Sequence, residues 1–224
     1  SVVTWGNPSY GGDSSSVSAA LNNSSNKVTQ IFSNRCAFAA LRSDGTVVTW
    51  GGSGYVPTAL NDSNNTVTQI SSTSDAFAAL RSDGSVITWG NSYSGGISSG
   101  SVSAALNDNT NKVVRIFSVS SAFAALRSDG SVVTWGDSYF GGDSSAVSSA
   151  LSDNTNKVTN IFTAKGAFAA LRSDGSVVTW GYPYGGGNSS IVSAALNTSS
   201  NKVTQIFSAG HAFAALRSDG SVVT

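Results

Sequence analysis

Short apolar runs alternate with polar turns along the whole chain, and the same order of runs returns five times. A typical repeat reads "VSAAL", "KVTQIFS", "AFAALR" and "SVVTW", in that order. No segment keeps a 3.6-residue hydrophobic period over a useful length, so we interpret the four runs as strands. Asp-Gly between the last two runs is a strong hairpin signal, and Asn-rich turns such as "NDNTNK" are typical strand ends. The pattern predicts four antiparallel strands per repeat.

The repeat is nearly exact in its central part. The nonapeptide "AFAALRSDG" recurs unchanged, and it begins at Ala37, Ala76, Ala122, Ala167 and Ala212. Four short strands in about 45 residues, repeated in tandem, are typical of a β-propeller. We predict an all-β fold, a five-bladed β-propeller of four-stranded antiparallel blades, in which residues 1–224 form a single repeat domain. Small residues of "AFAAL" suit a strand near the central axis, and its Phe is expected between blades.

The chain carries "SVVT" at both ends, as residues 1–4 and 221–224. One interpretation is ring closure, in which the N-terminal "SVVTW" pairs beside the C-terminal "AFAALR". The other is continuation, in which the chain is part of a longer array and the last "SVVT" belongs to the next unit. We predict a ring closed by its N- and C-terminal strands.

Composition narrows the classes of function. Apolar residues make up 40% of the chain and charged residues 11%, and the formal net charge is zero. Because no basic run is present, we expect no nucleic-acid partner. No apolar stretch approaches the roughly 18 residues of a membrane helix, so we expect no membrane insertion. A single cysteine, Cys36, leaves no intrachain disulfide to form.

The segment "AFAALRSDGSVVTWG" resembles the core of the regulator-of-chromosome-condensation repeat, in which a strand, an Asp-Gly turn and a strand ending in Trp-Gly recur. The resemblance covers essentially the whole chain and implies a β-propeller. That family usually builds seven blades, and it tends to place His and a Gly-Gln-Leu-Gly motif where this chain has Ala and "GGDSS". Its members range from nucleotide exchange factors to enzyme inhibitors and adhesive bacterial modules. The resemblance therefore implies a binding scaffold rather than a reaction.

A meander alternates its loops between two faces. The Asn-rich turn and the Ser-Asp-Gly turn are expected on one face. The tripeptide before each "AFAALR" and the connection between blades are expected on the other. These tripeptides differ in every repeat: 34–36, 73–75, 119–121, 164–166 and 209–211. We expect any recognition to use this second face.

Every connection between blades also keeps an aromatic residue after Trp-Gly. Tyrosine rings can stack on sugar or peptide surfaces while nearby polar groups supply hydrogen bonds. The alternative is that each ring packs beneath its "GG" turn. The candidate ligand-binding residues are Tyr10, Tyr55, Tyr93, Tyr139, Tyr184, Asp13, Asp143 and Asn188.

Catalytic and metal-binding patterns are weak. Cys36 and His211, the single His, lie in different repeats, and a nucleophile needs its base within hydrogen-bond reach. One carboxylate per "GGDSS" turn supplies too few oxygens for calcium. We therefore predict no enzymatic activity, no catalytic or metal site and no cofactor.

Two functions remain. The first is a lectin-like or adhesive propeller for multivalent recognition of a glycan or protein surface, strengthened by avidity. The second is a structural building block of an extracellular filament or repeat array, whose partners are other copies of itself joined through terminal strands. The Ser-, Thr- and Asn-rich surface favours an extracellular or cell-surface location.

Overall fold

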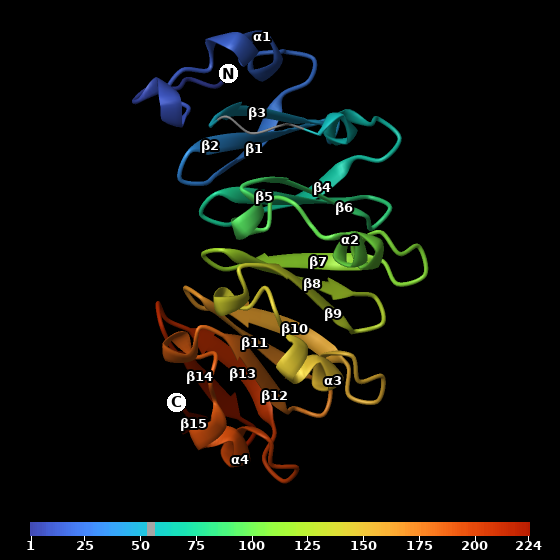
Figure 1. Cartoon of the computed structure of the whole chain (residues 1–224), viewed down its shortest axis with the longest axis vertical. Coiled ribbons are helices and arrows are strands. Elements are labelled where there is room, and N and C mark those ends of the chain that lie inside the picture. Colours follow the sequence, from blue (N-terminus) through green and yellow to red (C-terminus); the bar gives the residue numbers. More distant parts are fainter. Residues whose placement is uncertain (53–56) are drawn as a thin grey trace.

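The computed structural model of the chain describes residues 1–52 and 57–224. Within those residues, five three-stranded antiparallel sheets stack in sequence order along the longest axis of the molecule (Figure 1). Each sheet is one blade, numbered here from the N-terminus. The strands are β1 Val28–Ser33, β2 Ala37–Arg42, β3 Val47–Gly51, β4 Val67–Ser72, β5 Ala76–Arg81, β6 Val86–Gly90, β7 Val113–Ser118, β8 Ala122–Arg127, β9 Val132–Gly136, β10 Val158–Thr163, β11 Ala167–Arg172, β12 Val177–Gly181, β13 Val203–Ser208, β14 Phe213–Arg217 and β15 Val222–Val223.

The "AFAALR" strand lies in the middle of each sheet, paired on both edges. It is therefore the central strand of its blade and not an edge strand. The predicted Asp-Gly hairpin joins it to the following strand. In the third blade the turn glycine, Gly130, has a φ of +84°, and a Cβ there would lie 2.5 Å from the Cβ of Lys157 in the next blade. Both the turn and the neighbouring blade thus require glycine at this position.

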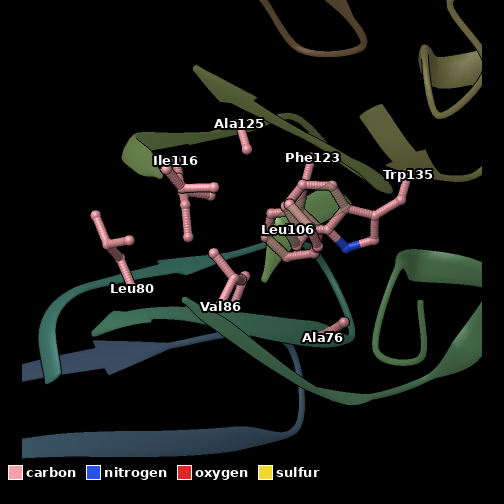
Figure 2. Close-up of a cluster of buried hydrophobic side chains, with 10 residues drawn as sticks. Ala76, Leu80, Val86, Leu106, Ile116, Phe123, Ala125 and Trp135 are labelled. Carbon is pink, nitrogen blue, oxygen red and sulfur yellow. The ribbon is translucent and has the colours of Figure 1, made fainter. Parts of the chain in front are cut away.

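Adjacent sheets pack face to face through apolar side chains. A recurrent β-bulge in the first strand of each blade, between Val113 and Arg115 in the third, places Val113 and Ile116 on the same face. Figure 2 shows the contact between the second and third blades, where Leu80 and Val86 face Ile116, Phe123 and Trp135. The predicted position of the Phe side chains between blades is confirmed, because Phe123 is fully buried in this cluster.

The expected first strand of each repeat is wrong. The "VSAAL"-type segments form short helices: η2 Ser15–Val17 with α1 Ser18–Leu21, η3 Thr58–Asn61, α2 Gly100–Leu106, η6 Ser145–Val147 with α3 Ser148–Leu151, and η8 Ser190–Val192 with α4 Ser193–Leu196. Ala has the highest helix propensity, and one helical turn brings Val102 and Leu106, four residues apart, onto one face. Both side chains then reach the cluster between the second and third sheets. Each blade consequently has three strands and a helical turn at its entrance.

The remaining short helices of the described residues lie in the connections that follow four of the Trp-Gly pairs. They are η1 Pro8–Tyr10, η4 Ser92–Ser94, η5 Ser138–Phe140 and η7 Pro183–Gly185. No helix in the described ranges has the length and apolar character to cross a membrane.

Ring closure by terminal strands is not what the structure shows. The N-terminal and C-terminal blades lie at opposite ends of the stack (Figure 1). Residues 1–4 contact the segment that leads into their own first blade, where the Val2 N–H donates to Asn22 Oδ1 at 2.8 Å. In the fifth blade, β14 pairs with β13 and β15. The described blades form an open stack and do not complete a circle (Figure 1).

Candidate binding face

The loops divide between two faces of the stack as predicted. The loop between the first two strands of a blade contacts the connection to the next blade: the Tyr182 N–H donates to the Gly166 carbonyl at 2.8 Å, and the Asp137 N–H to the Ser121 carbonyl at 2.9 Å. The Asn-rich and Ser-Asp-Gly turns meet at the other end of the strands, where the Ser43 hydroxyl donates to Asn26 Oδ1 at 3.0 Å. We call the first of these surfaces, which carries the divergent tripeptides and the inter-blade connections, the variable face.

The variable loops are tied from blade to blade by backbone hydrogen bonds. The Arg35 N–H donates to the Ser74 carbonyl at 2.9 Å, and the Ser74 N–H donates to the Ser120 carbonyl at 2.7 Å. The Ser120 N–H donates to the Lys165 carbonyl at 3.0 Å, and the Lys165 N–H donates to the Gly210 carbonyl at 2.9 Å. The side chains that differ between repeats therefore project from a backbone that is fixed across neighbouring blades.

The candidate tyrosines lie on short helical turns of this face. The exposed fractions are 53% for Tyr10, 82% for Tyr93, 56% for Tyr139 and 82% for Tyr184. Tyr55 lies outside the described residues. A ring packed beneath its "GG" turn would be largely buried, so these exposed fractions do not fit that alternative. The space beneath the turn is filled by a phenylalanine ring of a strand. In the third connection a Cβ on Gly141 would lie 2.9 Å from the ring of a strand phenylalanine.

Four aromatic rings from two successive connections touch one another, and we call Tyr139, Phe140, Tyr182 and Tyr184 the aromatic cluster. Tyr139 lies 5.5 Å from Phe140 and 5.3 Å from Tyr182 between ring centroids, and Tyr182 lies 5.8 Å from Tyr184. Tilted and edge contacts at these separations are favourable for aromatic rings. Phe140 and Tyr182 are half-buried beneath the exposed outer rings. The cluster offers a fixed apolar surface edged by phenol groups.

One loop glycine makes the cluster possible. A Cβ on Gly166 would lie 2.6 Å from the ring of Phe140 and 3.2 Å from the Cβ of Tyr182. The other repeats carry larger residues at this position, Cys36, Asp75, Ser121 and His211. The fourth tripeptide is thus adapted to the aromatic residues beside it.

The polar candidates cap turns instead of pointing at the cluster. Asp13 Oδ1 accepts from the Ser15 N–H at 2.8 Å, and Asp143 Oδ1 accepts from the Ser145 N–H at 2.8 Å. Asn188 makes the same contact with the second residue after it, at 3.0 Å. The backbone hydrogen bond lowers the pKa of both carboxyls. All three side chains are exposed.

The structure does not bring the two catalytic candidates together. Cys36 belongs to the first blade and His211 to the fifth, at opposite ends of the stack. In the part of the chain that the structure describes, no three His, Cys or Asp side chains gather as a metal site requires.

Sequence reasoning did not single out the supporting pair Phe140 and Tyr182. Their signal was a second aromatic residue within two positions of the candidate tyrosine in two consecutive connections.

Stacked antiparallel blades with one variable loop face define a propeller-type repeat fold. Residues 67–95 match the sequence model of the regulator of chromosome condensation (RCC1) repeat. The motifs of this segment recur in the other blades, so the predicted resemblance to the RCC1-like repeat family is confirmed. Comparison with curated proteins finds no match.

Solved structures share the fold at low sequence identity. The chain is similar to the CRINKLY WD40 ectodomain of the receptor kinase ACR4 from Arabidopsis thaliana, with 16% identity and a TM-score of 0.52 over 88% of this chain and 68% of that one. Human WBSCR16 has 19% identity and a TM-score of 0.55 over 88% of this chain and 61% of its own. Prp20p from Saccharomyces cerevisiae has 18% identity and a TM-score of 0.54 over 88% of this chain and 56% of its own. The chain thus spans about three-fifths of the length of the last two relatives, and the likeness concerns the fold.

Proposed function

We propose that the chain is a non-enzymatic binding propeller that recognises the surface of a partner, a protein or a glycan, through the tyrosines of the variable face. The observation that carries this proposal is the aromatic cluster, in which Tyr139 and Tyr184 stay exposed while their inner neighbours hold them in place. Aromatic residues are enriched at the centres of protein interfaces, because a rigid ring buries much surface at little entropic cost. The same rings stack on the apolar faces of sugars.

The proposal gains support from the scaffold. Prp20p, one of the proteins with a similar fold, has a structure described together with its binding to Gsp1p and histones. The ACR4 relative is a receptor ectodomain, which is compatible with the extracellular or cell-surface location that we propose here. Two further connections also carry exposed tyrosines, Tyr10 and Tyr93. Several weak contacts can therefore act together.

The test compares tyrosines inside and outside the aromatic cluster; Tyr184 inside it and Tyr93 outside it are both 82% exposed. Ligands are first selected for the intact chain on a glycan array and from a displayed peptide library. The selected ligands are then measured against Tyr139→Ser with Tyr184→Ser, and against Tyr93→Ser as the matched control. We expect the double variant to weaken binding by about tenfold or more, the size of an interface hot spot. The isolated Tyr93 should contribute less.

Two results contradict the proposal. One is that neither collection yields a ligand. The other is that selected ligands bind the double variant as tightly as the unaltered chain. Circular dichroism of both variants checks that the blades remain folded.

A second candidate function, self-assembly into an extracellular filament or array, is favoured by the near-identical repeats, whose sheets stack face to face along the chain (Figure 1). In the contact between the second and third blades, for example, Ile116 is buried against the preceding sheet. Electron microscopy and light scattering of the purified chain distinguish filaments from isolated stacks, and scattering from monomers alone at high concentration excludes this function.

A further inference from the structure

The two exposed tyrosines of the aromatic cluster are held by their turns. Tyr139 and Tyr184 occupy the same position in successive connections and lie within the short helical turns η5 and η7. Asp137 Oδ1 accepts from the Tyr139 N–H at 2.8 Å. Pro183 fixes φ at the start of the turn that carries Tyr184. The backbone therefore determines where both exposed rings lie.

The spacing of these two rings is about that of neighbouring sheets. Tyr182 lies 5.3 Å from Tyr139 and 5.8 Å from Tyr184 between ring centroids, so the two outer rings are at most about 11 Å apart. Sheets that pack face to face lie about 10 Å apart, which agrees with one tyrosine for each connection. A ligand that contacts both Tyr139 and Tyr184 must present matching groups at an interval of about 10 Å.

The rings of the cluster are tilted and do not form a flat platform. The ring planes of Tyr139 and Tyr182 meet at 52°, and those of Tyr182 and Tyr184 meet at 67°. Phe140 stands at 79° to Tyr139. Neighbouring rings at these angles expose edges and parts of faces. They suit a ligand with small apolar groups at intervals better than a ligand with one broad flat surface.

A positive charge borders the cluster. Lys165 precedes Gly166, the glycine that lies against the ring of Phe140, and its side chain is exposed. The Lys165 N–H donates to the Gly210 carbonyl at 2.9 Å, and the Lys165 carbonyl accepts from the Ser120 N–H at 3.0 Å. These bonds fix the backbone of the loop. The ion pairs of the described residues are made by arginines, which leaves the Lys165 ammonium group to a ligand.

The preceding connection carries an exposed tyrosine without this support. Tyr93 has the same position as Tyr139 and is 82% exposed. The residue after it is Ser94 in place of Phe140, and Ser121 takes the place of Gly166 in the neighbouring loop. Tyr93 therefore serves as a control that matches the exposure of the cluster but not its construction.

We propose that the aromatic cluster and Lys165 bind a proline-rich peptide that carries acidic residues and adopts the polyproline II conformation. This helix has three residues per turn and rises about 3.1 Å per residue, so it advances about 9 Å per turn. Residues i and i+3 therefore lie on one side at about the spacing of Tyr139 and Tyr184. Aromatic side chains are the usual recognition elements for such helices. A proline ring packs against each tyrosine, and the peptide carbonyls, which have no partner within the helix, accept from tyrosine hydroxyls.

The inference deepens the proposed binding function and rests on it, because it names the class of partner for the same tyrosines. An acidic residue of the peptide pairs with Lys165. An exposed pair of this kind adds little affinity but selects peptides of the right charge. Residues 1–224 contain three prolines at widely separated positions. They hold no segment of the required kind, so a second copy of them is not the partner.

The experiment titrates two labelled peptides of equal length and composition into the intact chain, followed by fluorescence anisotropy. One consists of three Pro-Glu-Ala triplets, so its prolines recur at every third residue. In the other, the same residues are rearranged so that the prolines are four residues apart. We expect saturable binding of the first peptide and at least tenfold weaker binding of the second. Tyr139→Ser with Tyr184→Ser should weaken the first peptide at least tenfold, and Tyr93→Ser should change its affinity by less than about twofold.

The charge is tested with a second pair of variants. Lys165→Gln should weaken the Pro-Glu-Ala peptide by about two- to fivefold, the range of an exposed ion pair. It should not affect the same peptide with Gln in place of Glu. Lys112→Gln removes an exposed lysine from an Asn-rich turn on the opposite face and should change neither affinity.

Three results overturn the inference. The first is that neither peptide binds saturably, and the second is that both bind equally. The third is that Lys165→Gln and Lys112→Gln have equal effects, which removes Lys165 from the site. If glycans or proline-free peptides bind through Tyr139 and Tyr184 while the Pro-Glu-Ala peptide does not, the inference fails and the proposed function stands. If no ligand of any class binds, both fail.

Discussion

The exposed end of the stack predicts that the same substitution has different costs in different blades. Ile31 in the first blade and Ile116 in the third occupy the same place in their sheets, opposite Ala40 and Ala125. Ile116 is 2% exposed in the contact with the second blade, whereas Ile31 is 48% exposed. We therefore compare Ile116→Ala with Ile31→Ala, a pair matched in residue type, register and strand.

The magnitude follows from burial. Truncating a buried Ile to Ala removes three carbon groups at about 0.8 kcal/mol each, or roughly 2.4 kcal/mol. A cavity left behind adds to this loss, so Ile116→Ala should cost about 2 to 5 kcal/mol. Ile31 loses about half of the transfer free energy and leaves no closed cavity. We expect Ile31→Ala to cost about 1 kcal/mol.

The assay is urea unfolding followed by tryptophan fluorescence, at a protein concentration low enough to keep the chain monomeric. The free energy of unfolding and the denaturant slope are obtained for each variant. Equal losses for the two variants would refute the reasoning, because they would mean that the outer face of the first sheet is covered in solution. Trp5→Ala, which changes an exposed residue, serves as a control for altered fluorescence.

Three further predictions follow from single contacts. Trp135→Phe removes the Nε1–H donor to the Gly95 carbonyl at 3.0 Å and should lower the melting temperature, since the buried acceptor loses its partner at about 1 to 3 kcal/mol. Gly130→Ala should be destabilising by more than 1 kcal/mol in calorimetry, because φ is +84° and the new Cβ meets Lys157. Burial acts to raise the pKa of Asp129, but hydrogen bonds from the following turn and a nearby arginine lower it overall. Its stabilising effect is therefore complete above the ordinary pKa of 3.8 and is lost as the pH falls toward the folded value. Asp129→Asn should flatten the acid limb of a stability profile, and an unchanged limb would contradict this assignment.

The sequence by itself determined the blade and its repetition. The identical "AFAALRSDG" segments encode a middle strand and an Asp-Gly turn, and both depend on neighbours within the same repeat. Local alternation and turn chemistry were sufficient for these features. They were sufficient too for the division of loops between two faces, which follows from the antiparallel meander. The RCC1-like resemblance rests on the same residues.

Local pattern failed where two structures satisfy it equally. In "VSAAL", Val and Leu four residues apart share one side of a strand and also one side of a helical turn. In the structure the segment is a helix, which brings Val102 and Leu106 into the cluster between the second and third sheets.

Tertiary structure alone decided how the repeats relate to one another. The angle between sheets depends on how Ala, Phe and Trp side chains interlock across blades, and no single repeat contains that information. The contacts leave the stack open, with Ile31 and Phe207 exposed at its ends. The aromatic cluster is decided in the same way, because Gly166 and Phe140 meet across separate loops.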